Sequence, residues 1–147
     1  MHCTLPALTI SQPYASLIAS GEKWVENRSW GTRYRGRIAI HAGKGMQYLT
    51  RKQLAEYPTG CLLAIVELAA CVSLNSLRRW RVRQADHFFG GYTVSKILDH
   101  EHTEGPVCWI LGDVRPIDPP IPYSGARGLW ECAIDQDLIP ALGASHE

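Results

Sequence analysis

The sequence has no long apolar run, no excess of one charge and no low-complexity segment. No stretch approaches the roughly 20 consecutive apolar residues that a membrane-crossing helix requires, and the first residues lack the basic and then apolar pattern of a signal peptide. We therefore expect a cytoplasmic protein without a membrane segment. Lysine and arginine number 15 and aspartate and glutamate 14, which leaves a formal charge of +1. The total charge thus predicts no general attraction to a polyanion, and only a local cluster can supply one.

Metal-ligand and disulfide patterns are also missing. Neither CxxC nor HxxxH occurs, so we expect no structural zinc, no other metal and no cofactor. The cysteines stand far apart, mostly in apolar runs that resemble strands, which favours buried thiols over the alternatives of a disulfide or a metal set. They are Cys3, Cys61, Cys71, Cys108 and Cys132.

What the sequence does contain fits one globular domain that spans residues 1–147. This length is close to the most common size of a single domain, and 46% hydrophobic with 20% charged residues are ordinary values for a folded chain. No segment repeats at a fixed period, which sets solenoids and propellers aside. The tail from Asp135 to the end is expected to be weakly ordered.

Six short runs predict β-strands. Their alternating or continuously apolar patterns are typical of half-buried and buried strands. The runs cover residues 7–10, 23–30, 37–42, 61–74, 107–117 and 129–134. Helices are expected after Ser11 and Pro13, over residues 48–57, and around Arg78–Arg83. Because strands and helices do not alternate strictly, we expect a mixed, mostly antiparallel β-barrel of the α+β class rather than a doubly wound parallel sheet.

Five blocks of this sequence resemble the ASCH domain family, named for the activating signal cointegrator. The resemblance covers about residues 5–134. It is carried, in order, by 8–18 with 21–30, by 34–36 with 40–42, by 60–63 with 66–68, by 109–116, and by 128–130. It implies a PUA-like barrel of about six strands with two to three flanking helices and a cleft for RNA, single-stranded nucleic acid, a nucleoside or a nucleotide.

The strongest candidate site in the sequence is the set Lys23, Glu26 and Arg28. Two cations around one carboxylate suit a phosphate and an exocyclic base amine. Strict alternation along a strand places Glu26 and Arg28 on one face and Lys23 on the other, unless a bulge near Gly21 intervenes. The simpler alternative is a surface ion pair between Glu26 and Arg28.

Other candidate ligand-binding residues surround this set. The corner formed by Ser11, Gln12, Pro13 and Tyr14 precedes a helix whose first N–H groups can receive an anion, although plain capping is the alternative. Lys44 lies in a glycine-flanked loop from which a lysine can reach a phosphate.

Four more side chains complete the predicted site. Glu67 stands alone in an apolar run, so it needs a cationic partner such as Lys23 or Arg28. Three aromatic residues offer stacking faces for a base, with core packing as the alternative. They are Trp30, Tyr34 and Trp130.

Whether the chain is also an enzyme is left open by the sequence. If it is one, Lys23, Glu26 and His41 are the catalytic candidates, with His41 as a general base or as an ordinary core histidine. The resemblance implies that one bacterial branch hydrolyses acylated cytidine with a threonine three residues after a catalytic lysine. Here that position is Glu26, so no hydroxyl nucleophile is present. A metal-independent ribonuclease is the other enzymatic alternative.

The preferred interpretation is therefore a binding module with a cationic cleft, and hydrolysis is the alternative. A third possibility is a cleft for a small anionic regulator. In that case the basic stretch Arg78–Arg83, which includes Trp80, docks a protein partner. The alternative for this stretch is a solvated helix face, or an arm that contacts phosphates.

Overall fold

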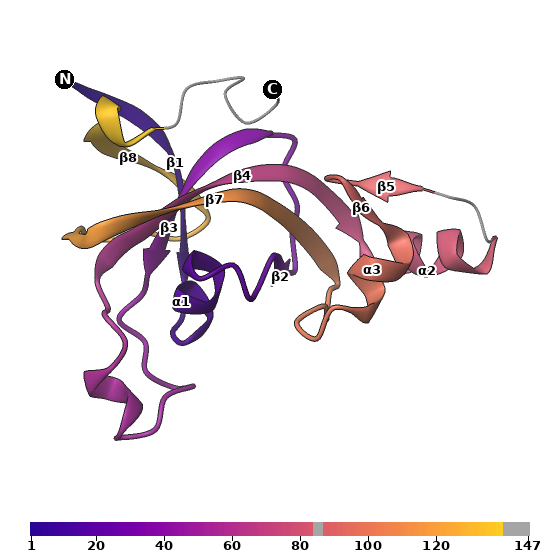
Figure 1. The fold of residues 1–147 in the computed structure, drawn as a ribbon, viewed down its shortest axis with the longest axis horizontal. Coiled ribbons are helices and arrows are strands. Elements are labelled where there is room, and N and C mark those ends of the chain that lie inside the picture. The colour runs from indigo at the N-terminus through magenta and orange to yellow at the C-terminus, as the bar shows by residue number, and fades with distance from the viewer. Residues whose placement is uncertain (84–86, 140–147) are drawn as a thin grey trace. The chain divides into compact units, whose positions relative to one another are not determined.

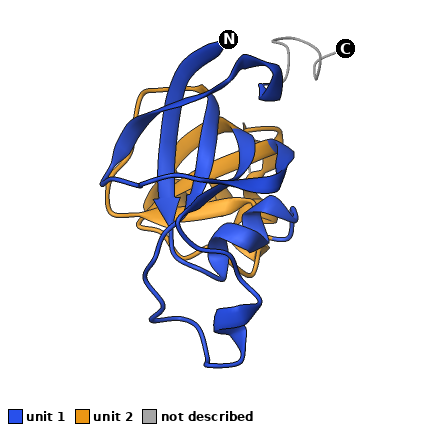
Figure 2. Cartoon of the chain, turned by 90° about the vertical axis from the view of Figure 1, so that its left-hand side faces the viewer, with its two compact units in different colours: residues 1–22, 37–66, 113–147 blue, residues 23–36, 67–112 orange. Residues whose placement is uncertain are grey.

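The computed structural model describes residues 1–83 and 87–139 (Figure 1). The chain divides into two compact units, each built from separate stretches of sequence (Figure 2). Unit 1 contains residues 1–22, 37–66 and the segment from Asp113 onward, and unit 2 contains residues 23–36 and 67–112. All sites discussed below lie within one unit or the other.

All six predicted strands are present, and they form one sheet in the order β2-β7-β4-β3-β1-β8. The strands are β1 (His2–Ile10), β2 (Val25–Arg28), β3 (Gly36–Ala42), β4 (Cys61–Ser73), β7 (Val107–Pro122) and β8 (Leu129–Asp135). The sheet is mostly antiparallel, with β1 and β3 as a parallel pair. Barrel closure is not confirmed, because in the described residues the strand order ends at β2 and β8 without a pairing between them. The small hairpin of β5 (Phe88–Phe89) and β6 (Tyr92–Thr93) was not predicted.

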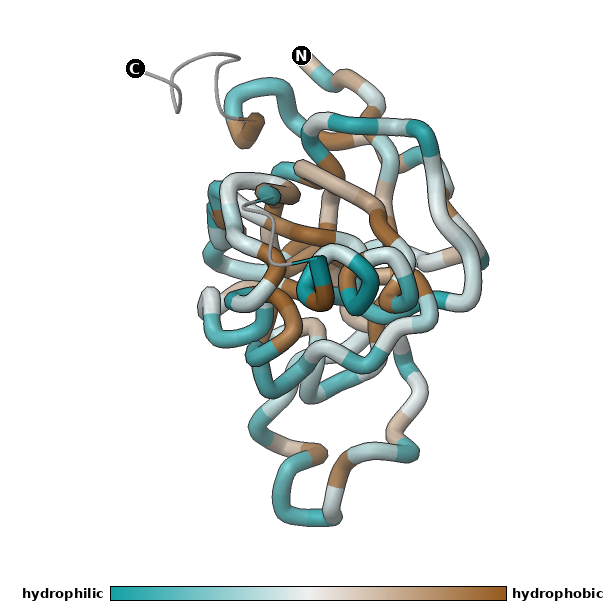
Figure 3. The backbone as a smooth tube through the Cα atoms, turned by 90° about the vertical axis from the view of Figure 1, so that its right-hand side faces the viewer, coloured by the Kyte–Doolittle hydropathy of each residue, from teal (hydrophilic) through white to brown (hydrophobic). Residues whose placement is uncertain are grey.

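The core of unit 1 forms between β1, β3, β4 and β8. Leu5, Ala7, Ala39, Leu62 and Cys132 are buried there together. Alternation along β1 turns Leu5 and Ala7 to this core, and the register pairs Ala7 with Ala39 on one side and with Trp130 on the other. Figure 3 colours the backbone by hydropathy and shows brown apolar stretches interspersed with teal hydrophilic ones.

Helix α1 (Tyr14–Ala19) is present where the sequence predicted it, but its capping differs. Pro13 occupies the N-cap position and provides no side-chain hydrogen bond, so Ser11 is not the cap. Instead the Gln12 Oε1 atom accepts a hydrogen bond of 2.9 Å from the Ser16 N–H. Gly21, with φ +87, follows the C-cap residue Ser20, since a positive φ there favours glycine.

The predicted helix over residues 48–57 is wrong. Only Gln53–Ala55 forms a turn of 3₁₀ helix, η1. A capping box is still present, because the Thr50 side chain accepts from the Gln53 N–H at 3.3 Å and the Gln53 side chain accepts from the Thr50 N–H at 3.0 Å. Tyr48 and Leu54 nevertheless remain 52% and 39% exposed. A short helix without a buried apolar face lacks the packing that stabilises most helices in proteins.

Unit 2 packs two helices against the halves of β4 and β7 that belong to it. Helix α2 (Leu74–Val82) begins at Ser73, whose side chain accepts a hydrogen bond from the Ser76 N–H, and α3 (Val94–Asp99) begins at Thr93 in the same way. Figure 1 shows α2, α3 and the β5–β6 hairpin close together. Their apolar side chains join one core with β2, β4 and β7, which includes Val25, Val72, Leu77, Val94, Ile97 and Ile110.

None of the helices in residues 1–83 and 87–139 is long and apolar enough to span a membrane. All five cysteines are free. The prediction of buried thiols is confirmed for Cys61, Cys108 and Cys132, whereas Cys3 and Cys71 are half-buried. Burial raises the pKa of the Cys108 and Cys132 thiols.

Candidate functional site

Two cations meet one carboxylate at the start of β2. The Lys23 Nζ atom lies 3.3 Å from one oxygen of Glu26, and Arg28 Nη2 lies 3.0 Å from the other oxygen. The side chains of Lys23 and Glu26 are 3% and 9% exposed, and that of Arg28 is 24% exposed. Both cations therefore contact the single carboxylate of Glu26. Arg28 is the member of this cluster that solvent reaches most.

The position of Lys23 corrects the alternation rule applied to the sequence. Strand β2 begins only at Val25, so Lys23 lies before the strand. The alternation of side chains between the two faces of a strand therefore does not apply to Lys23. Its ammonium group also donates a hydrogen bond of 2.5 Å to the Val25 carbonyl oxygen. The lysine thus folds back along its own chain toward Glu26. The alternative of a simple surface ion pair between Glu26 and Arg28 does not fit, because the Glu26 carboxylate is nearly buried.

Asn27, which the sequence did not single out, anchors the neighbouring loop. Its Oδ1 atom accepts hydrogen bonds of 2.8 Å from the backbone N–H groups of Glu104 and Gly105, and its Nδ2 donates at 2.7 Å to the His102 carbonyl oxygen. These partners lie 75 to 78 residues away in the sequence, so no local pattern could reveal them. One side chain therefore fixes the loop that leads into β7.

A second feature that the sequence missed is the aromatic group beside Lys23. The Trp24 ring stacks on Tyr92 with centroids 3.8 Å apart, and it also lies 4.3 Å from the His100 ring. His100 Nε2 accepts a hydrogen bond of 3.4 Å from the Trp24 N–H. Burial lowers the pKa of His100, and the charges of His102 and Lys23 lower it further. The imidazole therefore favours its neutral form.

The segment that follows β2 combines cations with aromatic rings. Arg33, Tyr34 and Arg35 are exposed, and partial burial raises the pKa of the Tyr34 hydroxyl. Arg35 Nη1 donates hydrogen bonds of 2.7 Å to the carbonyl oxygens of Thr32 and Tyr34, which shapes the loop. The half-buried Trp30 packs its ring edge-on against the fully buried Trp109 at 4.9 Å, and its stacking on a base stays a prediction.

Glu67 is the remaining candidate in unit 2. It is half-buried on β4 rather than fully buried, because the burial of β4 alternates from this residue onward. Its proposed pairing with Lys23 or Arg28 stays a prediction.

The predicted corner at the start of α1 lies in unit 1. Gln12 is fully buried, and its Nε2 donates to the Ser16 hydroxyl at 2.8 Å and to the Pro58 carbonyl oxygen at 2.7 Å. Tyr14 packs edge-on against Tyr48 with ring centroids 5.4 Å apart. The Gln12 amide is thus used to join α1 to the loop before β4. That the corner also receives a ligand stays a prediction.

His41 is buried and held at both ring nitrogens. Nε2 lies 2.7 Å from the Tyr123 carbonyl oxygen, and Nδ1 lies 3.2 Å from the Thr9 hydroxyl. Because a carbonyl only accepts, Nε2 carries a hydrogen and donates it to the Tyr123 carbonyl oxygen. The Thr9 oxygen in turn accepts a hydrogen bond of 3.0 Å from the indole N–H of Trp130. These contacts give both His41 and Trp130 a structural role.

Lys44 lies beside a tight turn at the other end of its loop. Gly60 there has φ +66, and a Cβ at this position would come within 2.9 Å of the Lys44 Cε atom. The aliphatic part of Lys44 therefore covers Gly60, while Lys44 as a whole remains exposed.

Residues 1–83 and 87–139 contain no group of three histidine, cysteine, aspartate or glutamate side chains able to hold a metal ion.

The candidates thus form two groups. Lys23, Glu26, Arg28, Trp30, Tyr34 and Glu67 belong to unit 2, and Ser11, Gln12, Pro13, Tyr14, His41, Lys44 and Trp130 belong to unit 1. The structure brings together Lys23, Glu26 and Arg28 in the first group, and His41 and Trp130 in the second. One cleft lined by all of these residues stays a prediction.

Comparison with known proteins agrees with the sequence resemblance. The ASCH domain model matches residues 8–133. Activating signal cointegrator 1 of Homo sapiens is 36% identical over an alignment of 92 residues, and the match covers 48% of this chain and 15% of the human protein. The Mus musculus protein of the same name is 40% identical over an alignment of 82 residues, and the match covers 45% of this chain and 14% of the mouse protein. The matching region therefore spans about a seventh of these two relatives.

A solved structure shares the fold. The crystal structure of ASCH from Zymomonas mobilis superposes with a TM-score of 0.50 and 21% sequence identity, and it covers 90% of this chain and 89% of its own. At this identity the likeness concerns the fold alone. Because the family model extends over most of the sequence, this chain belongs to the ASCH domain family.

Proposed function

We propose that this ASCH domain binds RNA, or a nucleotide or nucleoside, through the cationic cluster at β2. The observation that supports this proposal is the Lys23–Glu26–Arg28 cluster itself, which brings two cations to one carboxylate and leaves Arg28 partly exposed. A guanidinium held by a carboxylate is oriented before a ligand arrives, and a fixed guanidinium binds phosphate oxygens well. In this proposal Arg28 contacts the ligand, and Glu26 and Lys23 position it.

The exposed segment after β2 supports the same proposal. Arg33 and Arg35 add cations on either side of Tyr34, whose side chain is 36% exposed. Proteins that bind single strands combine a positively charged surface with aromatic rings on which bases stack. Tyr34 is the aromatic residue of this segment that offers a ring face, since Trp30 packs on Trp109.

Hydrolysis is the less well supported function. The proposed general base, His41, has both ring nitrogens within hydrogen-bond distance of protein partners. Position 26 holds a carboxylate that is engaged by two cations, which makes it a poor nucleophile for acyl transfer. Recognition without turnover is therefore the function that we propose. A cytoplasmic location stays a prediction.

Fluorescence anisotropy with labelled single-stranded RNA, followed over a range of salt concentrations, tests the proposal. Arg28→Ala is expected to weaken binding and to reduce the slope of log affinity against log salt by about one, as for the loss of one phosphate contact. Tyr34→Ala is expected to weaken binding by roughly 1–3 kcal/mol, whereas Tyr34→Phe keeps the ring and the affinity. Arg51→Ala is the matched control, because Arg51 is an exposed arginine of unit 1.

Two results contradict the proposal. If neither RNA nor free nucleotides bind, or if Arg51→Ala weakens binding as much as Arg28→Ala, the cluster at β2 is not the binding site. Incubation with acylated cytidine and with RNA, followed by chromatography, addresses turnover. A product that is lost in Lys23→Ala assigns the cluster to a hydrolase instead.

A further inference from the structure

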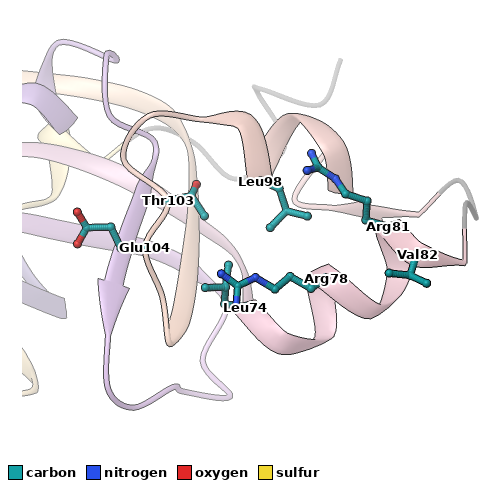
Figure 4. A pocket seen from close by; sticks show the side chains of 7 residues that line it. All are labelled: Leu74, Arg78, Arg81, Val82, Leu98, Thr103 and Glu104. Atoms are coloured by element: carbon teal, nitrogen blue, oxygen red, sulfur yellow. The ribbon is translucent and has the colours of Figure 1, made fainter.

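A groove of 580 Å³ runs between α2 and the segment around α3 in unit 2 (Figure 4). Leu74 and Val82 of α2 and Leu98 of α3 supply its apolar surface. Arg78 and Arg81 rise from the same helix, and Figure 4 shows the Arg78 side chain extended along the groove toward Leu74. The groove lies outside the cluster at β2 and contains none of its residues.

Hydrogen bonds and close packing hold this groove in shape. A Cβ at Gly105, which has φ +74, would approach the Leu74 Cβ to 2.8 Å, so Leu74 rests directly on the loop before β7. Asn27 holds the N–H groups of the same loop, and the Thr103 hydroxyl donates a hydrogen bond of 2.6 Å to the Ile97 carbonyl oxygen. A preformed groove loses little conformational freedom when a partner binds.

The charge along α2 is strongly positive. Four arginines occur within six residues, at positions 78, 79, 81 and 83. Arg81 forms an ion pair of 2.7 Å with Asp99, and Arg83 lies 5.9 Å from the centre of the Trp80 ring. In the part of the chain that the structure describes, Arg78 forms no ion pair and no side-chain hydrogen bond. The groove therefore combines an apolar floor with an available cation.

One exposed side chain shows that this apolar surface lacks a cover within the described chain. Val82 is 82% exposed, although it lies beside Leu98 and the arginines of α2. Exposed aliphatic groups beside cations are typical of surfaces that bind amphipathic peptides, where apolar side chains give affinity and charges give orientation.

We propose that the α2–α3 groove docks an acidic peptide segment of a partner protein that also carries apolar side chains. The apolar side chains of the peptide pack on Leu74, Val82 and Leu98, and its carboxylates face Arg78 and the neighbouring arginines of α2. The occupant is a protein segment rather than RNA for two reasons. Glu104 lies at the end of the groove beyond Leu74, where it would repel a continuous polyanion (Figure 4). The nearest aromatic face, Trp80, is already stacked on His87 with centroids 3.8 Å apart.

The probe is a fluorescein-labelled synthetic peptide that is rich in glutamate and carries leucines one helical turn apart. We expect saturable binding by anisotropy, and amide chemical-shift changes that concentrate on α2, α3 and the loop before β7. Arg78→Glu and Val82→Asp are each expected to weaken binding by about tenfold or more, since one repulsive contact of 1.4 kcal/mol has that effect. Both substituted side chains lie at the surface, and thermal unfolding checks that the fold is kept.

Three controls make the result decisive. A peptide with serine in place of leucine must bind more weakly than the leucine peptide. Arg51→Glu, a charge reversal in unit 1, must leave binding unchanged, as must Arg28→Ala, which tests the cluster at β2 separately. Equal binding of both peptides, absence of binding, or shifts on α2 and α3 caused by single-stranded RNA instead of the peptide would each overturn the proposal.

Discussion

Glu26→Gln is expected to destabilise the protein by roughly 3 to 5 kcal/mol, the usual range when one partner of a buried ion pair is removed. The reason lies in the two distances at the carboxylate. At 3.3 Å from Lys23 Nζ and an effective dielectric constant of about 20, the attraction is about 5 kcal/mol before the cost of removing both groups from water is subtracted. Arg28 adds less than its distance of 3.0 Å suggests, because it is 24% exposed and water screens it.

Lys23 is the origin of most of this expected loss. Its side chain is 3% exposed, so in Glu26→Gln a nearly buried ammonium group would lose its carboxylate partner, while its hydrogen bond to the Val25 carbonyl oxygen remains. The double variant Lys23→Met with Glu26→Gln removes that ammonium group as well. We therefore expect it to be less destabilised than the sum of the two single variants, with a coupling of about 1 to 3 kcal/mol.

Urea denaturation with linear extrapolation measures these differences. Glu131→Gln is the matched control, because Glu131 is an exposed carboxylate on β8, and we expect it to change stability by less than about 0.5 kcal/mol. A loss for Glu26→Gln no larger than that of the control would refute the reasoning. It would mean that the cluster behaves like an ordinary surface ion pair.

Three further predictions concern the surrounding structure. Gly125→Ala is expected to lower the free energy of unfolding by about 1–3 kcal/mol in urea titrations, because the added Cβ would lie 2.6 Å from the His41 Cε1 atom. An unchanged midpoint would show that the loop shifts freely. Asn27→Ala is expected to destabilise by about 2–4 kcal/mol through the loss of three hydrogen bonds, and to speed amide exchange at 102–105. Protection equal to wild type would contradict the anchoring role. His100 has a lowered pKa in the folded state, so the unfolded chain binds more protons below the ordinary value of 6.5. Stability should therefore fall as the pH drops from 6.5 toward the lowered folded pKa, and less so in His100→Gln. Equal pH profiles for the two proteins, or an NMR titration of the His100 ring near 6.5, would count against this.

The strands could be predicted from the sequence because their signal is local. The continuous apolar run over 61–74 corresponds to β4, which ends at Ser73 where that side chain begins to cap α2. The helix expected over 48–57 shows the opposite case. Its spacing and capping box were present, but Tyr48 and Leu54 stay 52% and 39% exposed, even though the Tyr48 ring contacts Tyr14. Local propensity therefore predicts an element correctly only where packing agrees with it.

The candidate site was predictable in composition but not in geometry. The sequence pointed to Lys23, Glu26 and Arg28, yet the fold-back of Lys23 depends on backbone angles before β2 that the alternation rule does not contain. His41 was considered either a general base or an ordinary core histidine, and the sequence alone left both open. Its partners Thr9 and Tyr123 lie 32 and 82 residues away. Contacts at such separation depend on tertiary structure, which a single sequence does not show.

The hydrogen-bonded relay around His41 has a consequence for how the strands of unit 1 align. Thr9 and His41 are paired residues of the parallel β1–β3 ladder, and Trp130 comes from β8 on the other side of β1. The indole can only donate and the Tyr123 carbonyl can only accept, so both ends of the relay have fixed polarity. A slip of β1 by one residue would turn Thr9 to the opposite face and leave a buried donor and a buried acceptor without partners. The relay therefore penalises every neighbouring alignment of these three strands, so a few polar atoms within an apolar sheet select a single register.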